Sequence, residues 1–303
     1  MGPVSVVVPT WRRAPWLDRC LAGLQAQDPS PAEIVVVGRR EDEDAQVVVA
    51  SRASSADIPI RWVEVERPGH VAPVRLGIDT SAGDVVAVVD DDVVPQAGWL
   101  AALLDPFSDP SVACVGGRVV TPGQRARVRP DAGQIRWYGH HIGNVAMVRA
   151  PEPFDVAGVM ECNWAWRRAV LREVRFDPRL DFDDASMYGL DLTLQARERG
   201  SRVVYQPAAV VVNEGAPRDP SLARDDRVPR TFTYSRNYSL IASRHLRGLR
   251  LPAFWLWWLL IGERGSYGVA TAVVDLIAGR TSPAIVTASF KGKFAGVRQW
   301  LAG

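Results

Sequence analysis

The sequence is poor in cysteine, with only three among 303 residues. Cys20, Cys114 and Cys162 have neither the short paired spacing of a zinc site nor the density of a disulfide framework. Neither is therefore indicated, and a reducing compartment is expected. A basic segment followed by an apolar stretch is also missing before the first apolar run, so we expect no signal peptide and predict a cytoplasmic location.

A long apolar run is absent as well. The segment Leu251–Ile261 is about a dozen residues long, whereas a helix needs about twenty to span a bilayer. With 47% hydrophobic residues, the chain can still bury a large core. We therefore predict one large folded domain with a smaller appendage.

Charge is divided unevenly along the chain, although the formal total is only +2. Residues 1–221 contain 24 Lys and Arg against 30 Asp and Glu, whereas residues 222–303 contain 12 against 4. This basic end has two apolar stretches, 251–261 and Val269–Ala278. The first stretch follows three arginines, Arg244, Arg247 and Arg250. It contains a cluster of three tryptophans, Trp255, Trp257 and Trp258.

Tryptophan rings beside arginines suit a membrane surface, where the rings lie among the headgroups and the cations meet anionic lipid. We therefore expect peripheral contact with the inner face of the cell membrane. The alternative is a pair of C-terminal helices that packs on the rest of the protein or on another subunit, so an oligomer is possible. Nucleic acid is not an expected partner, because no recognition motif accompanies the arginines.

The start of the chain has the pattern of a strand, a helix and a second strand. Val4–Val8 is an apolar run that ends at Pro9, and Trp16–Gln27 has apolar residues at helical spacing. Glu33–Val37 is another apolar run. This succession predicts a parallel sheet with a right-handed crossover.

Three consecutive aspartates, Asp90, Asp91 and Asp92, follow the apolar run 85–89. The run predicts a buried strand that carries carboxylates at its end. In a parallel α/β sheet, ligands bind outside the carboxyl ends of the strands. Because hard divalent cations prefer oxygen ligands, the triplet is a candidate site for Mn²⁺ or Mg²⁺ beside a phosphate-bearing substrate. A solvated turn is the alternative.

Several motifs follow one another in a familiar order. The first half contains Val6–Arg13, Glu33–Val37, Arg75–Ile78, and Ser81–Asp84 leading into the aspartate triplet. The second half contains Asn163–Arg168, Phe176–Pro178, Tyr188–Asp191 and Tyr205–Pro207. In this order the motifs resemble those of family 2 glycosyltransferases with the GT-A fold, over roughly residues 4–215.

The resemblance implies an α/β fold with a mostly parallel central sheet. It implies a catalytic domain over residues 1–218, with the nucleotide side up to about residue 115 and the acceptor side over 116–218, followed by a helical C-terminal region over 219–303. The implied activity is an inverting transfer of a sugar from a nucleoside-diphosphate sugar to an acceptor hydroxyl. A lipid-linked or other cell-envelope glycan is the expected acceptor, because the basic, tryptophan-rich end would bring the site to such a substrate.

The resemblance also implies roles for individual residues. Asp191 matches the general base. The residues matched to metal binding are Asp90, Asp92 and Asn213, and those matched to the nucleotide sugar are Pro9, Thr10, Arg12, Arg75, Asp90 and Asp91. The alternative for the segment after the first strand is a plain strand-to-helix turn in which Thr10 is the cap. The alternative for Arg75 is an ordinary arginine on a helix surface.

Aromatic and imidazole side chains are further candidates. Trp164 and Trp166 are a candidate acceptor platform, because sugars present apolar C–H faces that stack on aromatic rings. The alternative is that one of the two rings belongs to the core. His140 and His141 are better interpreted as a loop pair than as contacts to metal or phosphate.

Three departures from the family pattern keep another function open. Gly38-Arg39-Arg40 replaces acidic residues at the end of the strand that begins at Glu33, Leu190 replaces a glutamate before Asp191, and Asn213 replaces a histidine. The alternative is a catalytically weak relative that binds a nucleotide sugar or serves as a membrane assembly partner. A nucleotidyltransferase is less favoured, because the segment after the first strand lacks a glycine-rich phosphate loop.

Overall fold

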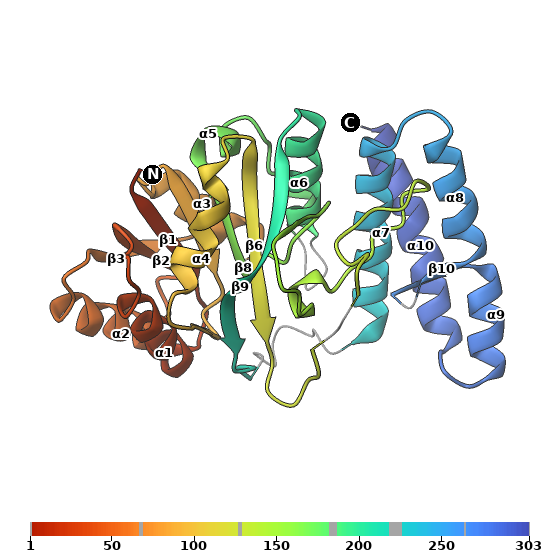
Figure 1. Cartoon of the computed structure of the whole chain (residues 1–303). Coiled ribbons are helices and arrows are strands. Elements are labelled where there is room, and N and C mark those ends of the chain that lie inside the picture. Colours follow the sequence, from red (N-terminus) through yellow and green to blue (C-terminus); the bar gives the residue numbers. More distant parts are fainter. Residues whose placement is uncertain are drawn as a thin grey trace. The chain divides into compact units, whose positions relative to one another are not determined.

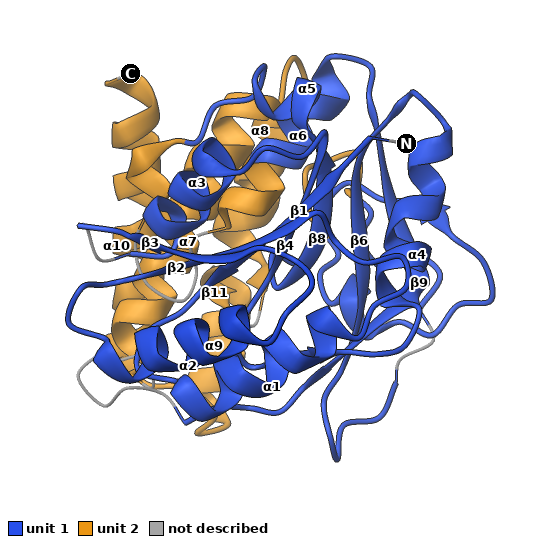
Figure 2. Ribbon diagram, turned by 90° about the vertical axis from the view of Figure 1, so that its left-hand side faces the viewer, with its two compact units in different colours: residues 1–134, 142–176, 192–217 blue, residues 135–141, 177–191, 218–303 orange. Residues whose placement is uncertain are grey.

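The computed structural model describes residues 2–66, 69–126, 129–181, 187–217, 226–263 and 265–302. The chain forms two compact units (Figure 2). Unit 1 comprises residues 1–134, 142–176 and 192–217, and unit 2 comprises residues 135–141, 177–191 and 218–303. Two segments predicted to belong to the acceptor side, 135–141 and 177–191, thus group with the C-terminal residues, while the predicted domain boundary at residue 218 stays a prediction.

Unit 1 is built on a nine-stranded sheet whose order is β3-β2-β1-β4-β8-β6-β9-β5, with β7 paired to β9 (Figure 1). Strands β1 to β4 are parallel neighbours, β8 is antiparallel to both β4 and β6, and β6 is parallel to β9. The predicted, mostly parallel sheet is confirmed. The strands are β1 (Val4–Pro9), β2 (Glu33–Gly38), β3 (Ile60–Glu64), β4 (Val85–Val89), β5 (Val93–Pro95), β6 (Val112–Val120), β7 (Phe154–Asp155), β8 (Asn163–Arg167) and β9 (Arg202–Asn213).

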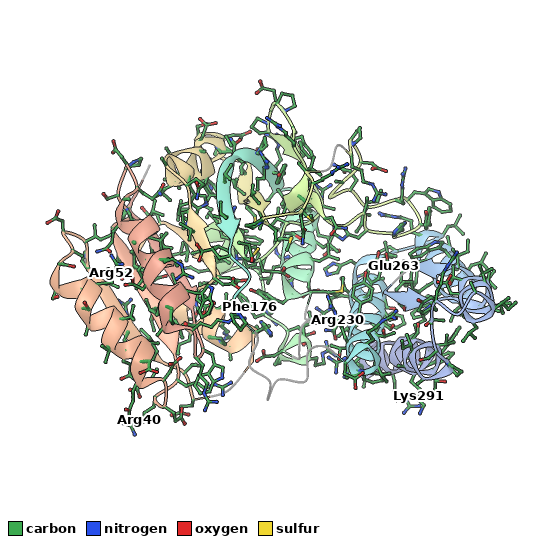
Figure 3. The ribbon with its side chains drawn as sticks, turned by 90° about the horizontal axis from the view of Figure 1, so that it is seen from below. Arg40, Arg52, Phe176, Arg230, Glu263 and Lys291 are labelled. Carbon is green, nitrogen blue, oxygen red and sulfur yellow. The ribbon has the colours of Figure 1, made fainter. Side chains whose placement is uncertain are left out.

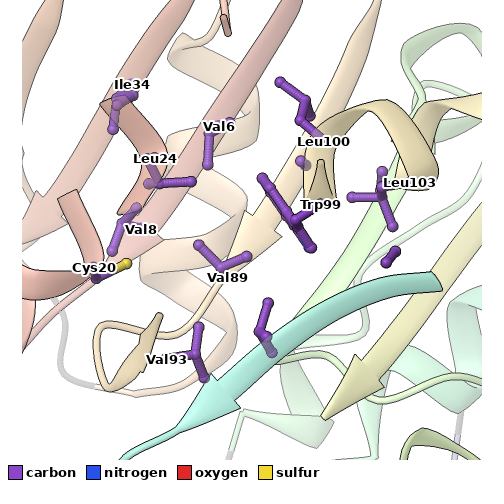
Figure 4. Close-up of a cluster of buried hydrophobic side chains, with 14 of the residues drawn as sticks. Val6, Val8, Cys20, Leu24, Ile34, Val89, Val93, Trp99, Leu100 and Leu103 are labelled. Carbon is purple, nitrogen blue, oxygen red and sulfur yellow. The ribbon is translucent and has the colours of Figure 1, made fainter. Parts of the chain in front are cut away.

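Helices cover both faces of this sheet, because successive strand residues point to opposite sides. Val6 and Val8 of β1 join a core cluster with residues of α1 (Ala14–Gln25), α2 (Glu43–Ser54) and α4 (Trp99–Leu104), part of which is shown in Figure 4. Helix α3 (Val71–Thr80) packs against β1 and β2. The predicted strand–helix–strand unit at the start of the chain is present as β1, α1 and β2.

The remaining helices lie later in the chain. Helix α5 (Arg168–Leu171) is a single turn after β8, and α6 (Tyr188–Glu198) precedes β9. Unit 2 contains α7 (Arg227–His245), α8 (Arg250–Leu260), α9 (Val269–Ile277), α10 (Pro283–Leu301) and a short hairpin of β10 (Gly262–Glu263) and β11 (Ser266–Tyr267). No helix in the described ranges has the length and apolar content to cross a membrane.

The core of unit 2 contains two large side chains of α8 and a lysine. Phe254 and Trp258 have no exposed surface, and the Trp258 indole donates a 2.9 Å hydrogen bond to Ser239 Oγ of α7. Lys293 of α10 is also fully buried, and its ammonium donates to the carbonyls of Trp258 and Tyr267. Burial lowers the pKa of Lys293 to about 7.

The C-terminal apolar stretches form the helices α8 and α9, and their packing corrects one expectation. Trp258 is a core residue and Arg244 is ion-paired within unit 2, so neither faces a bilayer. The large exposed apolar side chains of these two stretches belong instead to other positions of α8, the turn that follows it, and α9: Leu256, Leu260, Ile261, Val269, Val273, Val274, Leu276 and Ile277. We call this set the α8–α9 apolar face.

Candidate active site

The aspartate triplet follows β4 at the carboxyl end of the parallel strands. Because β1 and β4 are parallel neighbours, the residues that follow each strand meet at the same sheet edge. Thr10 Oγ1 donates a 2.7 Å hydrogen bond to Asp91 Oδ2, and Arg13 Nη1 donates a 2.9 Å hydrogen bond to Asp91 Oδ1. Asp91 is only 3% exposed. Its carboxylate therefore ties the segment after β1 to the segment after β4.

Burial raises the pKa of Asp91, while the Arg13 guanidinium and the Thr10 hydroxyl act in the opposite direction. For Asp90, the effects that favour the ionised carboxylate are weaker than those that oppose it. Its pKa is raised to about 7 by burial and by the neighbouring carboxylates of Asp92 and Asp91, which outweigh the attraction of Arg13. A bound cation would reverse this effect, because an opposite charge favours the ionised carboxylate.

Asp92 has the carboxylate oxygen of the triplet that best fits a cation. Its Oδ2 lies 3.3 Å from Arg13 Nη1, but its Oδ1 is buried and has no hydrogen-bond partner in the described part of the chain. A buried carboxylate oxygen without a partner is costly, so it calls for a cation or a donor. The residues present thus fit a hard divalent ion on Asp90 and Asp92.

This is an open site. Within the described ranges, no group of three or more His, Cys, Asp or Glu side chains is arranged to hold a metal. Mg²⁺ in phosphate chemistry is usually bound through one or two carboxylates, substrate phosphates and water, without a closed protein cage. A pair of strand-end carboxylates is therefore suited to an ion that reaches the protein together with a phosphate group.

Asn213, the third predicted ligand, ends β9 close to the segment that carries Asp92. It is paired with Val93 in the β5–β9 ladder, and the Glu214 backbone N–H donates to the Asp92 carbonyl at 2.9 Å. The Asn213 side-chain oxygen accepts a 2.8 Å hydrogen bond from the Gly215 N–H, which closes an Asx turn. The structure thus brings Asn213 to this edge but engages its oxygen locally, and its role as a ligand stays a prediction.

The predicted nucleotide contacts after β1 lie beside acidic residues. Arg12 has a positive φ of 54°, and its backbone N–H donates a 2.6 Å hydrogen bond to Asp42 Oδ2. Arg12 and Asp42 line a hollow of about 530 Å³ together with Ala14, Pro15, Glu41, Glu43 and Asp44. The acids that the sequence lacks directly after β2 are thus supplied a few residues later.

The arginines that replace those acids take separate positions. The Arg39 guanidinium lies 4.1 Å from the centre of the Trp11 ring, a cation–π contact. Arg40, labelled in Figure 3, is exposed and lies 3.6 Å from Glu64. Arg75 is on the exposed side of α3, with its Nε 3.5 Å from Asp79 Oδ2 one turn later. A phosphate contact by Arg75 therefore stays a prediction.

The acceptor platform expected at Trp164 and Trp166 needs correction. Both residues lie on β8, where positions two apart point to the same face, and both have no exposed surface. Their rings meet edge to face with centroids 5.4 Å apart. Since both indoles are part of the core, neither presents a ring face to a sugar.

Asp191 occupies the first turn of α6 and is held by the end of α7. Arg244 Nη1 donates to both carboxylate oxygens of Asp191, at 2.8 and 2.9 Å, and His245 Nε2 lies 2.8 Å from Oδ1. Asp191 is 1% exposed. Arg244 also ion-pairs with Asp177, so one guanidinium holds two carboxylates together.

Asp177 anchors the other side of this cluster. Burial opposes its ionisation, but hydrogen bonds from Arg179 and Arg244 outweigh burial and lower the pKa of Asp177 to about 2. Sequence reasoning missed Arg13, Arg244 and His245 as site residues. The position of Arg13 just after a strand end could have indicated a site residue. Arg244 and His245 are more than 50 positions from Asp191, and no sequence pattern links them to it.

Comparison with known proteins identifies the family of the chain. A model of the family described as glycosyltransferase like family 2 matches residues 2–233. The chain belongs to glycosyltransferase-like family 2. The family resemblance predicted from the order of the motifs is thereby confirmed.

Curated relatives of this family 2 chain include a pre-mycofactocin glycosyltransferase of Mycobacterium tuberculosis. It is 27% identical over 293 residues, which cover 91% of this chain but 56% of the relative, so the chain spans just over half of that protein's length. A GalNAc(5)-diNAcBac-PP-undecaprenol beta-1,3-glucosyltransferase of Campylobacter jejuni is 27% identical over 36% of each chain.

Solved structures identify the fold of this family 2 chain. A mannosyltransferase from Pyrobaculum calidifontis, solved with GDP-Man and Mn²⁺, has a TM-score of 0.59 and 19% identity, covering 99% of this chain and 87% of that one. GalNAc-T7, solved with UDP, GalNAc and Mn²⁺, has a TM-score of 0.59 and 16% identity, with 80% and 48% covered. The predicted GT-A fold is confirmed.

Proposed function

We propose that the protein is an inverting, divalent-cation-dependent glycosyltransferase that moves a sugar from a nucleoside-diphosphate sugar to a hydroxyl of a lipid-linked or other cell-envelope glycan. The observation that carries the proposal is the pair of half-buried carboxylates of Asp90 and Asp92, with the buried and unpartnered Oδ1 of Asp92, at the carboxyl end of β4 in the described part of the chain. The Mn²⁺ named with both solved neighbours supports a divalent cation, Mn²⁺ or Mg²⁺.

In this proposal Asp90 and Asp92 hold the ion, and Asp91 keeps the two strand-end segments together through Thr10 and Arg13. When bound, the cation would neutralise the charge that develops on the departing diphosphate. Arg13, which already lies against Asp91 and Asp92, adds a fixed positive charge at this edge. The pair of carboxylates and the arginine would orient the donor.

Asp191 is the proposed general base. In a single in-line displacement, the acceptor oxygen bonds to the anomeric carbon while the bond from that carbon to the phosphate oxygen breaks. The acceptor proton passes to a carboxylate oxygen of Asp191. Arg244 and His245 would fix the direction of that carboxylate.

A catalytically weak relative that binds a nucleotide sugar is the second candidate. One observation favours it: Asp191 is 1% exposed and both Arg244 and His245 already bond to its carboxylate, so an acceptor hydroxyl would have to compete with these partners for a carboxylate oxygen. Turnover separates the two candidates, because both would bind the donor but only a transferase would consume it.

The α8–α9 apolar face supports the proposed acceptor class and a peripheral location on the cytoplasmic side of the membrane. Ile277 is 83% exposed and Leu256 is 64% exposed. Several large apolar side chains exposed on two consecutive helices are typical of an interaction site. Arg247, Arg250 and Arg280 are exposed near the ends of α8 and α9, whereas Asp275, the only acid in these two helices, lies 3.5 Å from Arg280. Cations beside apolar side chains suit anionic lipid.

The metal site can be tested with Asp92→Asn, which removes charge and keeps shape. A ligand that binds only the folded state raises the melting temperature, so wild-type protein should be stabilised by a nucleotide sugar in the presence of Mn²⁺. Asp92→Asn should lose this stabilisation, and Asp105→Asn, an exposed acid of unit 1, should retain it. Unchanged Mn²⁺ dependence in Asp92→Asn would overturn the assignment.

Membrane contact can be tested by vesicle co-sedimentation of full-length protein. Binding should rise with the phosphatidylglycerol content and fall with salt, at about 1 kcal/mol per well-placed cation. Ile277→Asp should release the protein, whereas Phe294→Asp, at an exposed position of α10 outside the face, should not. If wild-type protein ignores anionic vesicles at low salt, or if Ile277→Asp only dissociates an oligomer, the membrane proposal fails.

A further inference from the structure

Residues 135–141 form a tight turn within unit 2. Ile135 and His141 make an isolated antiparallel bridge, and the Gly139 N–H donates a 2.8 Å hydrogen bond to the Arg136 carbonyl. Gly139 has a φ of 89°, and a Cβ at this position would overlap the side chain of Leu246. The backbone of the turn is therefore fixed by close packing against the segment that follows α7.

A buried tyrosine also supports this turn. The Tyr238 hydroxyl of α7 donates a 2.8 Å hydrogen bond to the Gly139 carbonyl and accepts a 2.6 Å hydrogen bond from the His141 N–H. Tyr238 is 1% exposed. From α8, Arg250 Nε donates a hydrogen bond to the Trp137 carbonyl at 2.8 Å. A turn held from two sides in this way can present side chains in a defined arrangement.

The side chains that it presents are aromatic. Trp137 is 65% exposed and meets Tyr138 edge to face with ring centroids 5.9 Å apart. Trp257 of α8 stacks on the His140 ring at 4.5 Å and lies 5.4 Å from the Tyr138 ring. We call Trp137, Tyr138, His140 and Trp257 the aromatic platform.

Polar groups border the aromatic platform. His140 Nε2 lies 3.4 Å from the Glu263 carboxylate, whose side chain is 22% exposed, and Tyr234 donates its hydroxyl to the same carboxylate. Glu263, the last residue of β10, is labelled in Figure 3. A pyranose ring has one apolar C–H face and a rim of hydroxyls, so it needs a ring surface next to hydrogen-bonding groups. A carboxylate at this border disfavours an anionic lipid headgroup.

We propose that the aromatic platform binds a pyranose ring of the acceptor glycan, which stacks on Trp137 and bonds to His140 and Glu263 through hydroxyls. The acceptor role rests on the proposed function, whereas the binding of a sugar by the platform does not. The proposal replaces Trp164 and Trp166, whose rings are buried, by rings that a sugar can reach.

Saturation-transfer difference NMR on the full-length protein tests the binding of sugar directly. The probes are methyl α- and β-glycopyranosides of glucose, galactose and mannose, since weak ligands at millimolar concentration are detectable by this method. At least one of them should receive saturation at the ring C–H protons of one face. Trp137→Ala should reduce this signal about tenfold, and Phe294→Ala, an exposed aromatic position elsewhere in unit 2, should leave it unchanged.

Two results would overturn the proposal. One is the absence of saturation transfer to every methyl glycoside in wild-type protein. The other is an equal signal in wild-type protein and Trp137→Ala. Loss of binding to anionic vesicles in Trp137→Ala, with no glycoside signal in wild type, would assign the turn to a membrane surface and also count against the proposal.

A second measurement separates this proposal from the proposed transferase activity. The Mn²⁺-dependent stabilisation by a nucleotide sugar should be the same in wild-type protein and Trp137→Ala, because the platform contacts the acceptor only. If wild-type protein binds glycosides but shows no such stabilisation by any donor, the transferase proposal fails and the platform stands. If donor binding is present and glycoside binding absent, the platform fails alone. In an active enzyme, Trp137→Ala should raise the acceptor KM about tenfold with little change in kcat.

Discussion

The ionised carboxylate of Asp177 should contribute measurably to stability, because it holds Arg244 next to Asp191. Its pKa falls from an ordinary value of 3.8 to about 2 in the folded protein, through hydrogen bonds from Arg179 and Arg244 that outweigh its burial. One pKa unit corresponds to 1.36 kcal/mol, so the ionised form stabilises the folded state by about 2 kcal/mol at neutral pH.

Asp177→Asn removes this ionisation and keeps the shape of the side chain. Arg244 retains Asp191 as a partner, so the variant should fold. We expect a loss of about 2 kcal/mol at pH 7. Because the unfolded carboxyl takes up its proton before the folded one, the difference from wild type should shrink as pH falls below about 4 and reach about half near pH 3.

Urea unfolding followed by tryptophan fluorescence, at several pH values between 7 and 3, measures this difference. Asp105→Asn is the matched control, because Asp105 is an exposed acid and its replacement should leave stability within about 0.5 kcal/mol of wild type at each pH. A stability loss in Asp177→Asn that is the same at pH 7 and pH 3 would refute the electrostatic account and indicate altered packing instead.

Two further predictions concern unit 2. Asp191→Asn should reduce kcat by about 10² or more, measured by turnover, while Mn²⁺-dependent donor binding, measured by thermal shift, persists. If turnover and donor binding are lost together, Asp191 has a structural role instead. The pKa of Lys293 is about 7 in the folded protein and higher in the unfolded chain. Above pH 7 the unfolded chain therefore binds more protons than the folded protein, so the free energy of unfolding of the wild type should rise between pH 7 and 10. Urea unfolding of Lys293→Met should lack this rise; an identical rise in the variant would contradict the account.

Local patterns were sufficient to predict the frame of unit 1. The apolar runs that became β1 and β4 and the helical spacing that became α1 are short-range signals, and strand-end geometry then placed the aspartate triplet at a ligand-binding edge. The same rule also explains why Thr10 reaches Asp91, although they are 81 positions apart.

Contacts that depend on tertiary packing could not be predicted from the sequence. Nothing in the alternation of Trp164 and Trp166 tells that both rings lie on a covered sheet face, because a strand with one exposed face has the same spacing. Arg244 was assigned to lipid from its neighbours along the chain, but its partners Asp177 and Asp191 come from distant segments. The exposed residues of the α8–α9 apolar face could likewise be found only after Phe254 and Trp258 were seen to be buried.

The burial of Lys293 makes it an internal reporter of the opening of unit 2. The sequence contains only two lysines, Lys291 and Lys293, two positions apart on α10. Lys291 is exposed, whereas Lys293 has no exposed surface. An amine-directed reagent should modify Lys291 at once and Lys293 only through transient openings of the helices around it. The ratio of the two modification rates on a single peptide would therefore measure the free energy of that opening, with the neighbouring lysine as its own reference.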